Sequence, residues 1–487
     1  MSKRTTIIII AAIVIAAAAL RLPGIFTDFW LDEIWSLNIA KSVHSPADVV
    51  LSEAARIDNN HPLNTWYLYA LGDVRHWWLY RLPALATGIG SVIVVAHAMW
   101  RRSATEAIAA ALIVALSFPL VFYSSEARGY GLAVFFALLA FDAMLHYDHR
   151  PGWSSAIVFN IACVLGFLAH LTFAHVYLAA LYWTVLRARR TKRPIVQQLF
   201  WWARLNAVPL MFIIVLLRVF VRNMTIGGAE PADPWRVLVR TLSIALGGPD
   251  RTRLAIIFAL FAAALFAAAI IYLFRQRDDL WFFYLLAVVV APAFLLLYNL
   301  VLSQKPQPLM PRYFLVAVTM LLISIAHAAR AFVRLGTPGV VIGLVLAIVF
   351  VYANTARAIG FIHEGRGGYT RAIARMTAVS PDATVTVASD DNFRTGTLID
   401  FYRTRIVPQG RTIDFFFTAD SQTLNRSMPE WLIITDIPFF RTPDQLLSSG
   451  DGTIYRHNSH HSCYGLSGQT WTLYRIDLAE TARRRSR

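Results

Sequence analysis

Charged side chains are scarce in this 487-residue sequence: they make up 15% of its residues, whereas 57% are hydrophobic. Soluble domains carry about 25% charged residues. A soluble chain with so many apolar runs would need far more polar surface than this composition supplies. The composition therefore excludes an ordinary soluble protein and predicts a polytopic membrane protein.

Motifs that many nucleotide-dependent enzymes use are also missing. There is no P-loop, and no Asp-x-Asp pair to hold a metal on the diphosphate of a nucleotide sugar. The two cysteines, Cys163 in an apolar run and Cys463 near the end, are placed too differently to predict a disulfide. These absences disfavour a nucleotide-sugar donor, and we expect neither a metal nor a cofactor.

The balance of charge is strongly basic, with 45 Lys and Arg against 29 Asp and Glu and a formal net charge of +16. Such an excess can indicate a nucleic-acid partner, but the chain has no compact basic module with interleaved aromatic residues. Much of the excess lies in short loops between apolar runs, where positive charge sets membrane topology. We therefore expect membrane lipids as partners and no nucleic acid.

About eleven apolar runs can cross roughly 30 Å of hydrocarbon as helices. The first follows Lys3-Arg4 and ends in alanines, which is also compatible with a cleaved signal peptide. Because Arg21-Leu22-Pro23 is a poor cleavage context, an uncut first span is the better interpretation. The expected spans are 5–20, 82–100, 104–122, 129–146, 153–169, 171–186, 199–221, 254–274, 280–302, 312–329 and 338–356.

The placement of basic residues predicts the orientation of these spans. They concentrate in every second short connection, which is the positive-inside pattern. The N-terminus is then cytoplasmic, and an odd number of spans leaves residues 357–487 on the outer face. The residues of the expected inner connections are Arg101, Arg102, Arg150, Arg187, Arg189, Arg190, Lys192, Arg193, Arg275, Arg277, Arg330 and Arg334.

The sequence divides into a membrane domain, 1–356, and a polar C-terminal domain, 357–487. In the second part, 383–389 and 431–435 have the pattern of buried strands, and 393–403 that of a helix. Further strands are expected at 452–455 and 469–476. The predicted fold class is mainly α and polytopic, with a small C-terminal α/β extracytoplasmic domain.

The long outer loop, 21–81, carries the first candidate site, Asp32-Glu33, among aromatic and apolar residues. A carboxylate shielded from water gains the basicity that a general base needs. The alternative is that Asp32 caps a helix beginning at Glu33, although Trp35 at the third helical position would not complete a capping box. Aromatic-rich helices in this loop are typical of the membrane interface.

Three further clusters contain candidate binding residues. Asn60 and His61 precede Pro62, which can start a helix; they mark either an ordinary helix entry or a pocket for sugar hydroxyls. The other candidates are Glu126, Arg128 and Tyr130, then Lys305, Arg312 and Tyr313.

Each of the last two clusters has a simpler explanation. Glu126 and Arg128 could form a surface ion pair, since charges at the end of a span must be paired or solvated. Lys305 and Arg312 could extend towards lipid head groups. The functional interpretation is that arginine, a planar fork of donors, holds a phosphate.

Histidines elsewhere carry less weight. His457, His460, His461 and Cys463 are metal-ligand types, but their spacing is not a standard zinc pattern. His170 and His175 are typical of interfacial or packed histidines.

In combination, the motifs resemble those of the C-type (GT-C) glycosyltransferases, in particular the bacterial relatives of protein O-mannosyltransferases and lipid A aminoarabinose transferases. Each motif alone is weak, but they occur in the expected order over about 300 residues. The motifs are Asp32-Glu33 after the first span, His61-Pro62-Leu63 before aromatic residues, Glu126-Ala127-Arg128 with Tyr130, and Arg312-Tyr313 before a late span.

The resemblance implies a hexosyl or pentosyl transferase that uses a polyprenyl-phosphate sugar donor on the non-cytoplasmic face, usually with inversion. Asp32 would be the catalytic base, and Glu33 would either support it or contact the acceptor. The donor phosphate would lie with Arg128, Tyr130, Lys305, Arg312 and Tyr313, and the sugar or acceptor with Asn60, His61 and Glu126.

Two departures from the family pattern leave the pocket details open. Trp35 stands where a tyrosine is commoner, and His-Pro-Leu replaces His-Pro-Pro-Leu. The acceptor, whether glycan, lipid or protein, is not indicated. The expected location is the bacterial inner membrane, with the C-terminal domain periplasmic or extracellular.

Two other functions compete with the transferase. A transporter or flippase of lipid-linked sugars would typically show repeats and mid-span charges; the runs 254–274, 280–302 and 338–356 contain no charged residue. The second competing function is that of a catalytically inactive relative that serves as a subunit of an assembly.

Overall fold

The structure is a computed structural model that describes residues 2–57, 59, 61–190, 194–225, 233–250, 252–297, 309–416, 428–436, 443–447, 453–463 and 465–485. The chain forms two compact units. The first consists of Met1–Ile25, Ser36–Val74 and Trp78–Ile359. The second consists of Phe26–Trp35, Arg75–Trp77 and Gly360–Arg487.

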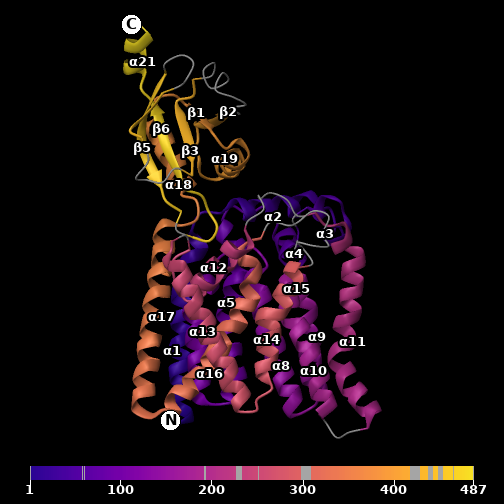
Figure 1. The fold of residues 1–487 in the computed structure, drawn as a ribbon. Helices are drawn as coiled ribbons and strands as arrows, with labels where there is room; N and C mark the ends of the chain where they lie inside the picture. Colours follow the sequence, from indigo (N-terminus) through magenta and orange to yellow (C-terminus); the bar gives the residue numbers. More distant parts are fainter. Residues whose placement is uncertain are drawn as a thin grey trace. The chain divides into compact units, whose positions relative to one another are not determined.

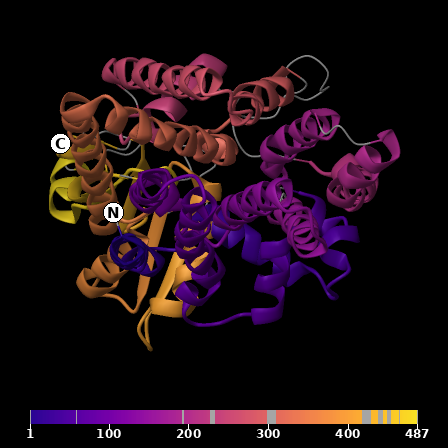
Figure 2. The same ribbon diagram turned by 90° about the horizontal axis from the view of Figure 1, so that it is seen from below.

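The first unit is a bundle of long helices that run side by side (Figure 1), and Figure 2 shows them from below. Helix α8 packs against both α5 and α9, and α16 packs against α6 and α13. Two helices belong to both units, because α2 begins and α17 ends within the second unit. The helices are α1 (Lys3–Arg21), α2 (Leu31–Ser42), α3 (Asp48–Leu51), α4 (Pro62–Leu71), α5 (Leu82–Trp100), α6 (Ala104–Leu116), α7 (Phe118–Tyr123), α8 (Tyr130–His149), α9 (Trp153–Ala169), α10 (Ala174–Arg190), α11 (Ile195–Val219), α12 (Pro234–Ala245), α13 (Leu254–Arg275), α14 (Leu280–Leu285), α15 (Ala291–Leu297), α16 (Leu315–Arg334) and α17 (Gly336–Glu364).

Each of the eleven expected spans contains a helix of the structure. Among the described residues, eight helical stretches are long and apolar enough to cross a membrane. Two of the other expected spans are occupied by shorter apolar helices, α6 and α9, and the third by α10. The chain is therefore a multi-pass membrane protein, as its composition predicts.

Local sequence explains where several of these helices begin. Ser2 and Ser103 accept hydrogen bonds from the first-turn N–H groups of α1 and α6, as capping serines do. Pro62 stands at the first position of α4, as predicted. Helix α12 begins at Pro234 after the capping residue Asp233.

The second unit contains a mixed six-stranded sheet with the order β2-β1-β3-β6-β5-β4. Strand β1 is parallel to β2 and β3, whereas β6 runs antiparallel to β3 and β5, and β4 antiparallel to β5. Helix α19 packs against β1, β2 and α18 (Figure 1). The elements are α18 (Tyr369–Val379), β1 (Thr384–Ser389), α19 (Asn392–Ile406), β2 (Thr412–Phe416), β3 (Trp431–Thr435), β4 (Gln445–Leu447), β5 (Ile454–His461), β6 (Trp471–Ile476) and α21 (Leu478–Arg485).

Four of the predicted C-terminal elements correspond closely to β1, β3, α19 and β6. The strand expected at 452–455 is longer and later, because β5 extends over Ile454–His461. The strand was not recognised beyond its start because most of its residues, from Arg456 to His461, are polar and show no alternation with apolar residues. Strands β2 and β4 and helix α18 were not predicted.

Candidate functional site

The loop that carries Glu126 and Arg128 follows an interruption of helix α6. Pro119 has no N–H, so the carbonyl of Ala115, four residues earlier, loses its helical donor. The N–H of Phe118 donates to Asn354 Oδ1 at 2.7 Å, so another carbonyl, that of Val114, loses its donor too.

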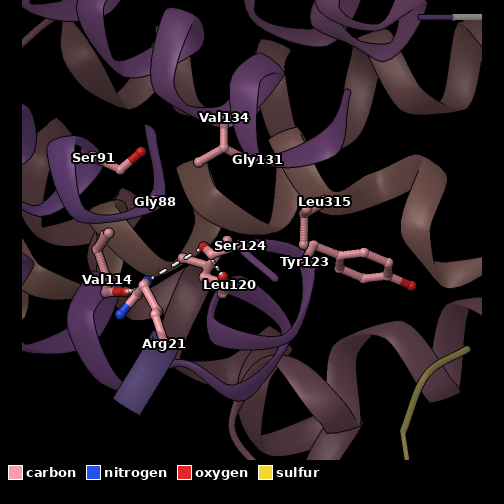
Figure 3. Close-up of a pocket in the computed structure, with 10 residues that line it drawn as sticks. All are labelled: Arg21, Gly88, Ser91, Val114, Leu120, Tyr123, Ser124, Gly131, Val134 and Leu315. Atoms are coloured by element: carbon pink, nitrogen blue, oxygen red, sulfur yellow. Dashed lines mark hydrogen bonds between the residues drawn. The ribbon is translucent and has the colours of Figure 1, made fainter. Parts of the chain in front are cut away.

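The buried side chain of Arg21 compensates for this break (Figure 3). Its guanidinium donates to Ala115 O at 2.7 Å and to Val114 O at 2.9 Å. Its Nε donates to Ser124 Oγ at 3.3 Å, and both residues line a small cavity. Arg21, at the end of α1, therefore bridges the interruption and holds the start of the loop that leads to Arg128.

Arg128 and His61 form a buried pair. The Nε of Arg128 donates to His61 Nε2 at 3.1 Å, and Ser36 Oγ lies 3.4 Å from the same nitrogen. Because an accepting ring nitrogen carries no proton, His61 is neutral with its proton on Nδ1. Burial, with the charges of Arg128 and Arg312, lowers the pKa of His61 well below its usual value. Its Nδ1 has no hydrogen-bond partner among the described residues.

Close packing holds this loop against its neighbours. A Cβ at Gly129 would lie 1.7 Å from Ala169 O and 2.7 Å from His61 Cβ, so no other residue fits there. Asn64 Nδ2 donates to Ala127 O at 2.8 Å. The backbone beside Arg128 is therefore fixed by α4 and by the end of α9.

Three rings, those of Tyr130, His170 and Tyr313, form an aromatic row beside the arginines. The centroids of Tyr130 and His170 are 4.6 Å apart, and those of His170 and Tyr313 are 6.3 Å apart. The guanidinium of Arg128 lies 5.5 Å from the Tyr130 ring, and that of Arg312 lies 5.8 Å from the Tyr313 ring. Both distances allow cation–π attraction.

His170 adds a hydrogen-bond donor to this row. Its Nδ1 accepts from the Thr172 N–H at 3.2 Å, which places its proton on Nε2. Burial lowers the pKa of His170 well below its usual value, so the ring is neutral. Neither His170 Nε2 nor the Tyr130 hydroxyl has a hydrogen-bond partner in the described ranges.

An apolar cavity of about 490 Å³ lies next to this part of the first unit. It is lined by residues of α12, α13, the α14–α15 segment and α16, and also by Leu309 and Phe314. These two residues flank Arg312 in the chain.

The carboxylates Asp32 and Glu33 belong to the second unit. Helix α2 begins at Leu31, so Asp32 lies within its first turn and is not its cap. The prediction that no capping-box contact forms was wrong: Glu33 occupies the third helical position, and its Oε2 accepts from the Trp30 N–H at 2.9 Å. Both carboxylates stand at the positive end of the helix dipole.

Solved structures with a similar fold identify the fold class of this protein. The structure of ArnT from Cupriavidus metallidurans without ligand matches with a TM-score of 0.53 at 11% sequence identity, over 99% of both chains. The same protein bound to undecaprenyl phosphate matches with a TM-score of 0.51 at 10% identity, again over 99% of both. The oligosaccharyltransferase of Archaeoglobus fulgidus without ligand gives 0.50 at 12% identity, over 89% of this chain and 70% of the other.

The protein has the GT-C fold. All three structures are of membrane glycosyltransferases with this fold. No protein-family model and no curated protein sequence matches the chain, so the likeness is one of structure.

Several predicted site residues come together within the first unit of this GT-C fold. Arg128 contacts His61, and the His170 ring lies between Tyr130 and Tyr313. The charges of Arg128 and Arg312 act on His170 as well. Glu126 is fully buried and Arg128 is buried, so the simpler alternative, which placed these two residues at the surface, is wrong about their position. Two predicted residues, Asn60 and Lys305, lie outside the described residues.

Sequence reasoning missed His170, Arg21 and Asn354 as parts of the site or its support. His170 gave one usable signal, because it directly follows the predicted span 153–169, at the end that was expected on the same side of the membrane as Arg128. Among the described residues, no group of three or more His, Cys, Asp or Glu side chains is arranged to hold a metal. In β5, His460 Nδ1 lies 2.8 Å from Thr472 Oγ1, and His461 stacks on Trp471.

Proposed function

We propose that this protein is an inverting membrane glycosyltransferase that moves a hexosyl or pentosyl group from a polyprenyl-phosphate donor to an acceptor hydroxyl. One observation carries the proposal: three buried polar atoms of the first unit have no hydrogen-bond partner in the part described, and they lie beside two arginines. These atoms are His61 Nδ1, His170 Nε2 and the Tyr130 hydroxyl.

This set of groups suits a sugar phosphate. Neutral N–H donors and a hydroxyl can bind the oxygens of a phosphate or a sugar, and two guanidinium groups balance its charge. Aromatic rings provide apolar faces for the sugar ring. An aqueous metabolite would need no apolar cavity, whereas a lipid-linked donor can place its isoprenoid chain in the cavity that Phe314 lines.

In the proposed reaction, Arg128 and Arg312 bind the donor phosphate, and Lys305 joins them. The Asp32 carboxylate removes the proton of the acceptor hydroxyl, while Glu33 holds the start of its helix. The acceptor oxygen bonds to the anomeric carbon, and the bond from that carbon to the phosphate oxygen breaks. The polyprenyl phosphate leaves with the electron pair, and the arginines stabilise the negative charge that develops on it.

The fold supports a donor of this class. The similar structure of ArnT holds undecaprenyl phosphate over a match that spans 99% of this chain. We further propose that the protein lies in a bacterial inner membrane with its N-terminus in the cytoplasm and residues 357–487 outside. The acceptor would then meet the donor on the non-cytoplasmic face.

Transfer from radiolabelled polyprenyl-phosphate sugars in proteoliposomes tests the proposal. The wild type should release labelled polyprenyl-free product, and Asp32→Asn should reduce the rate at least about a hundredfold, within the usual range for loss of a general base. Asp400→Asn, at an exposed position of α19, is the matched control and should retain full activity. If the label crosses the bilayer while still attached to its lipid, and Asp32→Asn has no effect, the protein is a flippase.

A further inference from the structure

The segment that carries the candidate base folds with the C-terminal part of the chain. Residues Phe26–Trp35 belong to the same compact unit as Gly360–Arg487, although more than 300 residues separate them in sequence. Arg75–Trp77 joins them. Asp32 is therefore part of the second unit, whose other elements are the sheet and its helices.

Hydrogen bonds attach the chain on the N-terminal side of Asp32. Asp28 accepts two bonds from Thr370, from the N–H at 3.0 Å and from the hydroxyl at 2.6 Å, at the start of α18. A carboxylate at a helix N-terminus also gains from the helix dipole. One residue further on, the Tyr402 hydroxyl donates to Phe29 O at 2.9 Å.

Aromatic contacts hold both sides of Asp32 on helix α19. Phe29 stacks on Phe401 with centroids 5.2 Å apart and an angle of 21°. Trp35 meets Phe393 edge to face at 6.2 Å. Such pairs stabilise a contact beyond the area that they bury, because the edges and faces of aromatic rings carry opposite partial charges.

Trp77, from the short segment Arg75–Trp77, also contacts both the segment before α2 and helix α19. Trp77 Nε1 donates to Thr27 O at 3.1 Å, and its ring lies edge-on to Phe401 and Tyr402, at 6.4 and 5.6 Å. Arg366 donates to the Thr27 hydroxyl at 2.8 Å. Directional contacts thus hold Asp28 on α18 and Phe29 on α19, while Trp77 and Arg366 hold Thr27.

We infer that α18 and α19 are the positioning device for the catalytic carboxylate: Thr370, Phe401 and Tyr402 set the place and direction of the first turn of α2, and hence of Asp32. This inference rests on the proposed function for the role of Asp32. It assigns the C-terminal domain a part in the chemical step. A domain that only selected the acceptor would have no need to hold this helix start.

The contacts make a specific kinetic prediction. The donor phosphate is assigned to residues of the first unit, whereas these anchors hold the segment that leads into the first turn of α2, where Asp32 lies. Loosening the anchors should therefore lower kcat and leave the affinity for the lipid phosphate unchanged. A displacement of about 1 Å in a catalytic group can cost about a hundredfold in rate.

The test compares the double variant Thr370→Val, Tyr402→Phe with Thr370→Ser, which retains the hydroxyl. Valine preserves the shape of threonine, and phenylalanine that of tyrosine, so the two changes remove only hydroxyl donors. Arg403→Gln, at an exposed position of α19, is the surface control. Three quantities are measured on the full-length protein: amide hydrogen exchange, kcat for sugar transfer, and Kd for undecaprenyl phosphate.

In the double variant we expect exchange in residues 26–35 to become at least fivefold faster while strand β1 is unchanged. We expect kcat to fall about tenfold or more and Kd to stay within twofold, with both controls like wild type. Unchanged exchange in 26–35 overturns the inference, and so does unchanged kcat or a parallel loss of donor binding. If the wild type transfers no sugar, the proposed function fails; the exchange result then still decides whether these residues hold the segment, and the catalytic part of the inference falls.

Discussion

Arg21 offers the sharpest test of how the site is supported. The Arg21→Met variant removes the donors that reach Val114 O and Ala115 O while keeping a long apolar stem. Both carbonyls have lost their helical donors, one to the Asn354 contact and the other to Pro119. The variant therefore leaves two buried acceptors without a donor.

The magnitude follows from the count of these acceptors. A buried polar group left without its partner costs about 1–3 kcal/mol, so two cost about 2–6 kcal/mol. Removing a buried charge recovers part of its desolvation penalty. We expect a net loss of about 2–4 kcal/mol, a large fraction of the 5–15 kcal/mol that stabilises a typical domain.

Thermal unfolding of the purified protein in detergent measures the effect. Arg21→Met should lower Tm by several degrees, and Arg21→Lys, which keeps one donor group, should fall between it and wild type. Arg218→Met is the matched control, because Arg218 is exposed on α11. The reasoning is refuted if Arg21→Met unfolds at the wild-type Tm, or if Arg218→Met lowers Tm as much.

Three further outcomes are expected. Burial lowers the pKa of His61 and His170, so at acidic pH the unfolded chain binds more protons than the folded protein does. The free energy of unfolding should therefore be highest above pH 6.5. Below that pH it should decrease by up to about 1.4 kcal/mol per pH unit for each histidine. Unfolding curves between pH 5 and 7.5 check this, and His61→Gln should flatten the dependence; a Tm that ignores pH contradicts it. Arg128→Gln should weaken binding of undecaprenyl phosphate at least about tenfold, since hydrogen bonds to charged groups contribute about 1.5–3 kcal/mol, whereas Arg218→Gln should not. His170→Phe keeps an aromatic ring but removes both the Nε2 donor and the Nδ1 acceptor of the Thr172 N–H, so it should weaken the same binding about five- to tenfold and also lower Tm; equal binding would remove His170 from the site.

Local patterns predicted the membrane helices because each apolar run must satisfy its own backbone within the bilayer. The interruption at Pro119 was not predicted, although the proline is visible, because a helix can also bend at such a residue and continue. Whether the helix bends or breaks at Pro119 depends on Arg21 and Asn354, which come from the first and the last helices of the bundle. The break is stable because both side chains lie beside it and satisfy the backbone groups that it frees.

The candidate site was predictable where residues occur in a motif. His61, Arg128 and Arg312 indicate an anion site by their residue types and their positions at the ends of apolar runs. His170 also lies at the end of an apolar run, but it occurs in no motif. Thr172, two residues away, places its proton, whereas its ring neighbours Tyr130 and Tyr313 come from distant parts of the chain and cannot be read from the residues around it.

The sequence by itself determined that this is a multi-pass membrane protein with a polar C-terminal part, because hydrophobicity and secondary structure depend on residues close together in the chain. Only the tertiary structure decided that Asp32 lies in a segment held by residues of that C-terminal part. The bonds between Asp28 and Thr370 join residues 342 positions apart. The residues next to Asp28 and Thr370 in the sequence do not indicate that the two will meet. A hydrogen bond between distant segments depends on where the whole fold places them.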